Sequence, residues 1–310
     1  MSSLVPGFAQ RYPRIDDDEA FWRDFERQAT PDSTRHAGLD PDCHAGLDPA
    51  SLTIESCCTS LNEALAAEAR GASRIELCTD LTVGGLTPPR DLIREVVDRL
   101  SIPVNVLIRP APSGTLRVSL PERLAPLDPS QAELGPLPLT MPRVAWFLER
   151  NPSASITDGP GRIREFTAKD FVYDEASLCQ MESDIDFCRK AGAAGVVVGA
   201  LTPAGAIDMP AMQRLVAAAG SLSVTFHRAF DVCSEDPVEA VDKIISLVCT
   251  RLLTSGRAPT AWEGRELIAS IVRHAGNRLI IMPGSGVRPE NLQALAACTQ
   301  ASEFHGTAIP

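Results

Sequence analysis

The stretch Val224-Thr-Phe-His227-Arg228-Ala-Phe-Asp231 joins an apolar, β-type run to a histidine, an arginine and an aspartate. In a parallel α/β fold the carboxyl ends of the strands face the reaction space, so polar residues at the exit of a strand indicate a site rather than scaffold. The alternative is a buried histidine beside a salt-bridged arginine that holds a loop. Other strands of the chain end in the same manner, which favours a site.

Outward from this stretch, from residue 52 onward, short β-rich runs alternate with amphipathic segments. The pattern predicts strands near 52–57, 74–78, 103–108, 194–198, 222–227, 250–254, 278–282 and 300–304. It predicts helices near 60–70, 89–99, 175–191, 208–219, 236–247, 261–275 and 289–297. Strands that alternate with helices in this way predict an α/β fold, a TIM-like (β/α)8 barrel. No Gly-x-Gly-x-x-Gly follows the first strand, which argues against a dinucleotide-binding sheet.

Three regions are expected along the chain. Residues 1–50, with a short repeat and many Pro, Asp and Arg residues, are expected to form a largely disordered extension. Residues 51–310 form the barrel, interrupted after strand three by a Pro-rich insertion at 111–165, of the kind that is either a lid or disordered. The sequence ends just past strand eight, which predicts that the final closing helix is lacking. The segment 19–28 or a second subunit, in a homodimer, would then cover the seam.

The composition excludes several classes of partner. A net charge of −11 argues against nucleic acid and against an anionic membrane surface. No apolar run is long enough for a membrane helix, and no signal peptide is recognisable at the N-terminus. The nine cysteines have no CxxC spacing and are odd in number, as is typical of a reducing compartment. The sequence therefore predicts a cytoplasmic protein.

Three strands carry a carboxylate two residues before a soft ligand: Glu55-x-Cys57, Glu76-x-Cys78 and Glu303-x-His305. Residues two apart on a strand share a face, and in a closed barrel strand eight pairs with strand one, and strand one with strand two. If these faces are interior, the two thiols and the imidazole lie side by side. Such ligands suit Cu(I) or Zn(II), which predicts a metal site. The alternative is that both cysteines are small side chains that fill the barrel.

Buried carboxylates need partners, and the sequence offers Arg109 and Arg228 at strand ends for Glu55, Glu76 and Glu303. The same two arginines are candidates to hold a small anionic ligand. Glycine-rich turns follow strands six and seven and add further candidate ligand-binding residues, Ser255, Gly256 and Gly284; tight turns alone are the alternative explanation.

The best candidate for a general acid or base is His227, with Asp231 and Glu76 as further candidate catalytic residues. No lysine ends a strand, which argues against Schiff-base chemistry.

The chain resembles the CutC copper homeostasis family through segments that run in order over residues 52–307. These are Ile54–Ser60, Gly71–Cys78, Gly84–Pro88, Ile108–Pro110, Val224–Asp231, Leu253–Gly256, Met282–Gly284 and Glu303–His305. The resemblance implies a cytoplasmic, self-associating TIM-like barrel, with Cu(I)-binding cysteines at Cys57 and Cys78. The chain departs from the family's strand-three motif, because Arg109-Pro110 runs into Ala111-Pro112 and the pattern resumes only near Asp170–Tyr173. The tail that members of the family have beyond strand eight is also missing.

Three functions follow from these patterns. The first is Cu(I) binding or trafficking by Cys57 and Cys78. The second is a barrel enzyme that acts on a small anionic or phosphorylated metabolite, with His227 as acid or base. The third is an inactive barrel that serves in protein interaction. The sequence does not decide whether the protein is an enzyme.

Overall fold

The structure is a computed structural model that describes residues 52–110, 123–124, 137–138 and 166–307. The extension at 1–50, the segment 19–28 and nearly all of the 111–165 insertion lie outside the described residues, so what the sequence predicts for them stays a prediction.

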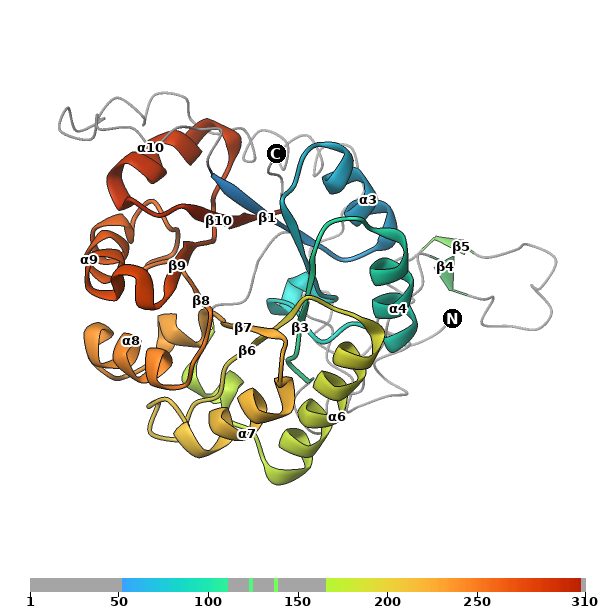
Figure 1. The fold of residues 1–310 in the computed structure, drawn as a ribbon, viewed down its shortest axis with the longest axis horizontal. Helices are drawn as coiled ribbons and strands as arrows, with labels where there is room; N and C mark the ends of the chain where they lie inside the picture. Colours follow the sequence, from blue (N-terminus) through green and yellow to red (C-terminus); the bar gives the residue numbers. More distant parts are fainter. Residues whose placement is uncertain (1–51, 111–122, 125–136, 139–165, 308–310) are drawn as a thin grey trace, which may run out of the picture. The chain divides into compact units, whose positions relative to one another are not determined.

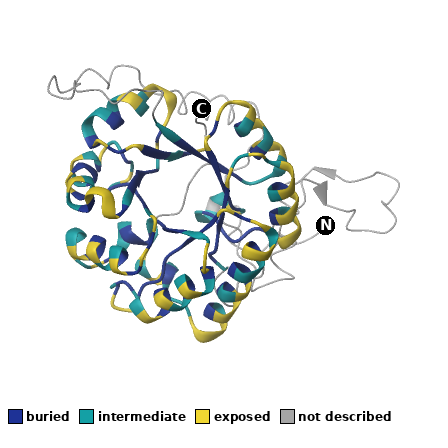
Figure 2. Ribbon diagram, viewed as in Figure 1, coloured by how far each residue is buried: buried dark blue, intermediate teal, exposed yellow. Residues whose placement is uncertain are grey.

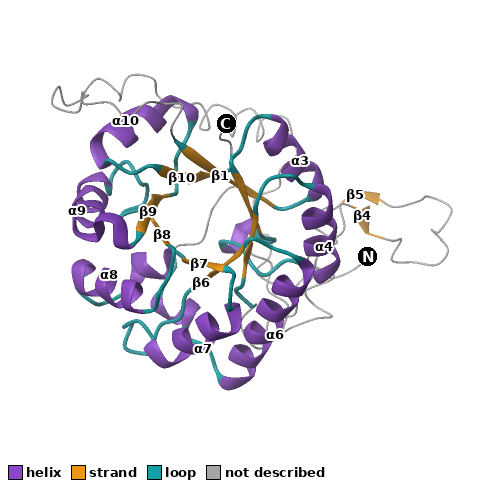
Figure 3. Cartoon of the chain, in the orientation of Figure 1, coloured by secondary structure: helices purple, strands orange, loops and turns teal. Residues whose placement is uncertain are grey.

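Eight parallel strands form one sheet, and helices surround it (Figures 1 and 3). The strand order is β10-β1-β2-β3-β6-β7-β8-β9. The strands are β1 (Thr53–Cys58), β2 (Arg74–Leu77), β3 (Val104–Leu107), β6 (Gly195–Val198), β7 (Ser223–Phe226), β8 (Arg251–Thr254), β9 (Ile280–Pro283) and β10 (Glu303–Gly306). The two ends of this order, β9 and β10, come together in the ring without a β-ladder among the described residues. The predicted TIM-like barrel is confirmed, with this one seam.

The helices between consecutive strands are α3 (Leu61–Ala69), α4 (Arg90–Arg99), α6 (Glu175–Ala191), α7 (Met209–Ala219), α8 (Pro237–Ser246), α9 (Arg265–Ala275) and α10 (Pro289–Thr299). Short 3-10 helices lie in the loops: η2 (Leu81–Val83), η4 (Ala168–Phe171), η5 (Arg228–Val232) and η6 (Gly276–Arg278). A separate antiparallel pair, β4 (Arg123–Leu124) with β5 (Leu137–Pro138), completes the described elements. No helix follows β10 in the part of the chain that the structure describes.

Local capping fixes where several of these helices begin. The side chains of Ser60, Asp174 and Asp208 each accept a hydrogen bond from a backbone N–H in the first turn of α3, α6 and α7, which satisfies a donor that the helix leaves open. Helix α6 ends at Gly192, whose φ of 85° is one that glycine adopts without strain.

The largest differences from the predicted element boundaries are at two turns. Helix α10 runs to Thr299, and Gln300 follows in a left-handed conformation, so β10 begins at Glu303 and not near residue 300. Helix α9 begins at Arg265 and not near 261, because Thr260 and Glu263 close a separate turn through their own hydrogen bonds. Both differences concern turns, where hydrophobic periodicity carries little information.

Apolar packing fills the layer between the strands and the helices, while the outer faces of the helices are exposed (Figure 2). The inner face of the strands is different, because it holds buried charged residues. At the amino ends of the strands, Arg74 on β2 donates from Nε to Glu55 at 2.5 Å and from Nη2 to Glu303 at 2.8 Å. Arg251 on β8 donates from Nε to the same oxygen of Glu303 at 2.7 Å.

These four side chains, Glu55, Arg74, Arg251 and Glu303, form an ionic layer. The prediction of which arginines pair with the buried glutamates is wrong. Glu55 and Glu303 pair with Arg74 and Arg251, which begin their strands, and not with Arg109 and Arg228, which follow the carboxyl ends of theirs. The reason is distance along the strand, because a glutamate near the start of a strand meets the side chains of the same level in its neighbours.

The ionic layer yields a stability prediction. Replacing Arg74→Met leaves Glu55 and Glu303 buried with part of their compensating charge removed, so we expect a loss of about 3–5 kcal/mol in the free energy of unfolding. Urea denaturation measures it. The matched control is Arg94→Met, which removes an exposed arginine 3.4 Å from Asp91 and should cost less than about 1 kcal/mol. Equal losses in the two variants would show that the ionic layer does not stabilise the barrel.

Candidate functional site

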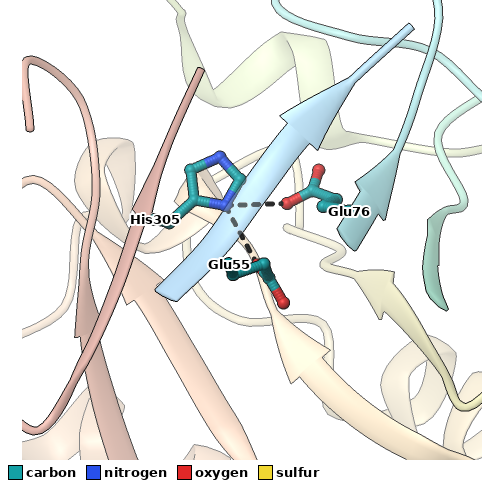
Figure 4. A group of neighbouring side chains, drawn as sticks. All are labelled: Glu55, Glu76 and His305. Carbon is teal, nitrogen blue, oxygen red and sulfur yellow. Dashed lines mark hydrogen bonds and ion pairs between the residues drawn. The ribbon is translucent and has the colours of Figure 1, made fainter. Parts of the chain in front are cut away.

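The barrel interior holds a group of three side chains, Glu55, Glu76 and His305, which Figure 4 shows on neighbouring strands; Glu55 belongs both to this group and to the ionic layer. Strand β1 pairs with β10 so that Glu55 is opposite His305, and with β2 so that Cys57 is opposite Glu76. His305 Nδ1 lies 2.9 Å from Glu55 Oε1 and 3.3 Å from Glu76 Oε2. One ligand atom from each residue lies within 4.8 Å of the others, a spacing that a metal ion can bridge.

The two carboxylates differ in their environment. Glu55 accepts from Arg74, from Asn105 Nδ2 at 3.0 Å and from His305. Burial favours its neutral form, but the hydrogen bond and charge of His305, together with Arg74, lower the pKa of Glu55 to about 2. The Oε2 atom of Glu76 is buried and has no hydrogen-bond partner, since its contact with His305 lacks hydrogen-bond geometry. Burial raises the pKa of Glu76 to about 7, against the opposing charge of His305.

His305 is held in its charged form by these neighbours. Burial alone would lower its pKa, but the charge of Glu76 and the hydrogen bonds to Cys57 and Glu55 raise the pKa well above its ordinary value. The group is therefore an imidazolium between one firmly ionised carboxylate and one that exchanges its proton near neutral pH.

A thiol pair lies next to this group. The Sγ atoms of Cys57 and Cys78 are 3.5 Å apart, and both residues are buried. The hydrogen bond to Cys78, followed by burial, raises the pKa of Cys57 well above its usual value. Leu107 and Val197 cover the pair from β3 and β6. The structure thus brings Cys57, Cys78 and His305 together as the strand order led us to expect.

At the carboxyl ends of the strands, the residues predicted to hold an anion form a second group. Arg109 donates from Nη1 to the carbonyls of Val83 and Gly85, at 2.8 and 2.7 Å. Arg228 donates from Nε to Asp231 at 2.8 Å. Both guanidinium groups lie over the ring of Phe166. Gly85 lies between Arg109 and the thiol pair. Its carbonyl accepts from Arg109, and a Cβ atom placed on it would lie 3.7 Å from Cys78 Sγ.

The turn after β8 is a predicted anion site, but its backbone N–H groups already donate to side chains of the protein. Asp231 accepts from the N–H groups of Ser255 and Arg257 and from the hydroxyl of Thr254, while the N–H of Gly256 donates to Thr254 Oγ1. The carboxylate of Asp231 thus accepts the hydrogen bonds that these backbone N–H groups would otherwise offer to an anion. These contacts favour a structural role for Asp231, Ser255 and Gly256. Gly284 packs against Leu253 and His305, where a Cβ atom would approach Leu253 to 2.5 Å.

His227 is more deeply buried than a free acid or base would be, at 5% exposure. Burial, and then the charge of Arg109, lower its pKa to about 3, so the ring is neutral at physiological pH. Its ring packs against Phe171 with 4.9 Å between centroids. These facts favour hydrogen bonding over proton transfer by His227.

Sequence reasoning missed Arg74, Asn105 and Arg251 inside the barrel, and Phe166, Phe171 and Tyr173 near its mouth. The period-two pattern carried a signal for one of them, since Arg74 lies two residues before Glu76 and therefore on the same face. The aromatic residues follow the long insertion. For Phe171 and Tyr173 the signal was the family's strand-three pattern, which resumes near Asp170–Tyr173.

Known proteins were compared with the chain. The model of the CutC family matches residues 52–116 and 161–310. A family protein CutC of Xanthomonas campestris pv. campestris (strain 8004) is 40% identical over 255 residues, which are 82% of this chain and 82% of the relative. The CutC of Histophilus somni (strain 2336) is 35% identical over 254 residues, which are 82% of this chain and 81% of the relative. A solved structure from Streptococcus agalactiae, described as a candidate copper homeostasis protein CutC, has a TM-score of 0.63 at 28% identity and covers 84% of this chain and 100% of its own.

The buried neutral state of His227 predicts how stability depends on pH. The pKa of His227 is about 3 in the folded protein, below its ordinary value of 6.5. As the pH falls below about 6.5, His227 therefore binds a proton in the unfolded chain but not in the folded protein, and this lowers the free energy of unfolding. We expect the parent to lose more stability than His227→Gln between about pH 7.5 and about pH 5, measured by urea unfolding. The range ends above the acid region in which Glu55 titrates. Parallel losses in parent and variant would contradict a neutral His227.

Proposed function

Because this chain belongs to the CutC family, we propose that it is a copper homeostasis protein that binds Cu(I) through the thiols of Cys57 and Cys78, with the imidazole of His305 as a third ligand. The observation that carries the proposal is the 3.5 Å separation of the two Sγ atoms. Metal–thiolate bonds of ~2.3 Å at a tetrahedral angle hold two sulfurs ~3.8 Å apart, so a small movement of either side chain suffices.

The chemistry of the donor set fits Cu(I). Thiolate sulfur is the soft ligand that Cu(I) prefers, and imidazole is a suitable third donor. The pKa values of Cys57 and His305 are both raised, so the ion displaces a proton from the thiol and one from the imidazolium when it binds. Uptake therefore releases protons and strengthens with pH. The hydrogen bond between His305 and Glu55 orients the imidazole, which is the usual role of a carboxylate behind a metal-binding histidine.

We place this activity in the cytoplasm. Eight cysteines in the described part of the chain are free, which fits a compartment that keeps thiols reduced. No helix among the described residues has the length and apolar character to cross a membrane. Self-association as a homodimer stays a prediction from the family resemblance.

The carboxylate chemistry supports a second candidate, an enzyme that acts on a small anionic metabolite. Glu76 has a buried oxygen without a hydrogen-bond partner, and its pKa of about 7 suits a general acid or base. This role moves the proton-transfer function from His227 to Glu76. The third function, an inactive barrel that serves in protein interaction, has no observation in the described residues that favours it.

The copper proposal is tested with the double variant Cys57→Ser, Cys78→Ser. We expect the parent to take up about one Cu(I) per chain under anaerobic conditions, and the variant to take up essentially none at the same free copper concentration, because a serine hydroxyl is a poor ligand for a soft ion. Competition with a chromophoric Cu(I) chelator measures the affinity.

The control for copper uptake is Cys179→Ser, which removes an exposed thiol outside the barrel interior. It should bind copper like the parent. If the double variant retained the affinity of the parent, copper binding by these thiols would be rejected. His305→Gln should lower the affinity about 10–100-fold and leave the two thiols as ligands.

A further inference from the structure

Two buried polar atoms near the carboxyl ends of the strands have no hydrogen-bond partner, His227 Nε2 and the phenol oxygen of Tyr173. His227 directly follows β7, and Tyr173 follows η4. Native proteins leave few buried polar atoms without a partner, because each such atom has lost its water without compensation. Two such atoms in one region therefore indicate that a bound group supplies the missing hydrogen bonds.

The hydrogen bonds of His227 fix which ring nitrogen carries the proton. Its Nδ1 accepts from the backbone N–H of Ala229 at 3.2 Å, so in the neutral ring the hydrogen is on Nε2. The ring is neutral because burial and Arg109 depress its pKa. His227 therefore presents a buried N–H donor, and Tyr173 presents a buried O–H donor.

Two arginines lie in the same region as these donors. The guanidinium carbon of Arg109 lies 5.1 Å from the centroid of the Phe166 ring and 5.4 Å from that of Phe171. That of Arg228 lies 5.9 Å from the Phe166 centroid. Phe171 in turn packs against His227. The charges of Arg109 and Asp170 both act on the phenol of Tyr173, in opposite directions. The two arginines and the histidine thus lie around one pair of aromatic rings, and the charge of Arg109 also reaches Tyr173.

The carboxylates of this region are used elsewhere. Asp231 accepts from Arg228, Thr254 and Ser255. Asp170 accepts from the N–H and the hydroxyl of Thr167 within its own turn. Neither aspartate accepts a hydrogen bond from His227 or Tyr173 in the described part of the chain. What these donors lack is an acceptor with negative charge.

We propose that the region around Phe166 and Phe171 binds a small oxyanion, a carboxylate or a phosphate group, which accepts hydrogen bonds from His227 Nε2 and the Tyr173 hydroxyl. The positive charges of Arg109 and Arg228 stabilise it. Arginine is the residue best suited to planar carboxylate and to phosphate, and strand ends are where barrels bind their ligands. The site does not depend on copper binding at Cys57 and Cys78. For an enzyme that uses Glu76, it would hold the charged end of the substrate.

The test uses the full chain with two probes, malonate for a carboxylate and inorganic phosphate for a phosphate group. We expect at least one probe to raise the melting temperature of the parent, because a ligand that binds only the folded state stabilises it by mass action. For the probe that binds, Tyr173→Phe and His227→Asn should each weaken the affinity about tenfold, since each removes one hydrogen bond to a charged group. Asparagine retains an acceptor for Ala229 and removes the Nε2 donor.

Two controls identify the site. Tyr12→Phe removes the other tyrosine of the chain and should bind like the parent. His227→Gln, which restores a donor near the Nε2 position, should bind more tightly than His227→Asn. Without a probe, Tyr173→Phe should be at least as stable as the parent, because its missing hydroxyl has no partner in the free protein.

Nitrogen NMR of the imidazole groups gives a readout that needs no variant. The Nε2 resonance of His227 should move when the probe that binds is added. The proposal fails if neither probe raises the melting temperature of the parent. It also fails if a probe raises the melting temperature without moving that resonance, or if folded Tyr173→Phe and His227→Asn bind as tightly as the parent.

Discussion

The interaction on which this barrel depends is the buried ion network between Arg74, Arg251, Glu55 and Glu303. Charges inside a protein are tolerated only when paired and hydrogen-bonded, and here each carboxylate accepts from at least one guanidinium group at 2.8 Å or less. The network links β1, β2, β8 and β10, and so connects strands on both sides of the seam between β9 and β10. It therefore connects the two sides of the ring where the described strands β9 and β10 form no β-ladder.

The same network also sets the position and the protonation of His305 through Glu55. With one oxygen of Glu55 bound to Arg74 and Asn105, the other is left for His305, which fixes the imidazole and keeps it charged. Glu76 receives less compensation, so burial raises its pKa toward neutrality. Two glutamates on adjacent strands thus acquire different protonation behaviour from their surroundings alone, an arrangement typical of functional sites. The thiols of Cys57 and Cys78 lie next to this group and are the soft donors through which we propose that Cu(I) binds.

The mouth of the barrel follows a different principle. Asp231 satisfies the backbone donors after β8 from within the chain, so that turn needs no external anion. Around Phe166 and Phe171 the balance is reversed, since His227 and Tyr173 offer donors that the neighbouring aspartates leave unmatched. The oxyanion that we propose would therefore gain hydrogen bonds from His227 and Tyr173, and not from the turn after β8.

The sequence by itself determined the alternation of strands and helices, the order of strands around the barrel and the shared face of Glu55 with Cys57 and of Glu76 with Cys78. These features depend on periodicity. Side chains alternate between the two faces of a strand, so once one face is buried the face on which each residue lies is fixed. Only the tertiary structure decided that Arg74 and Arg251, and not Arg109 and Arg228, neutralise Glu55 and Glu303. It also decided that His227 is neutral and that Asp231 is engaged by its own neighbours. Pairing and protonation depend on distances between strands that are far apart in the sequence, on burial, and on the direction of each side chain, and no local pattern of residues encodes them.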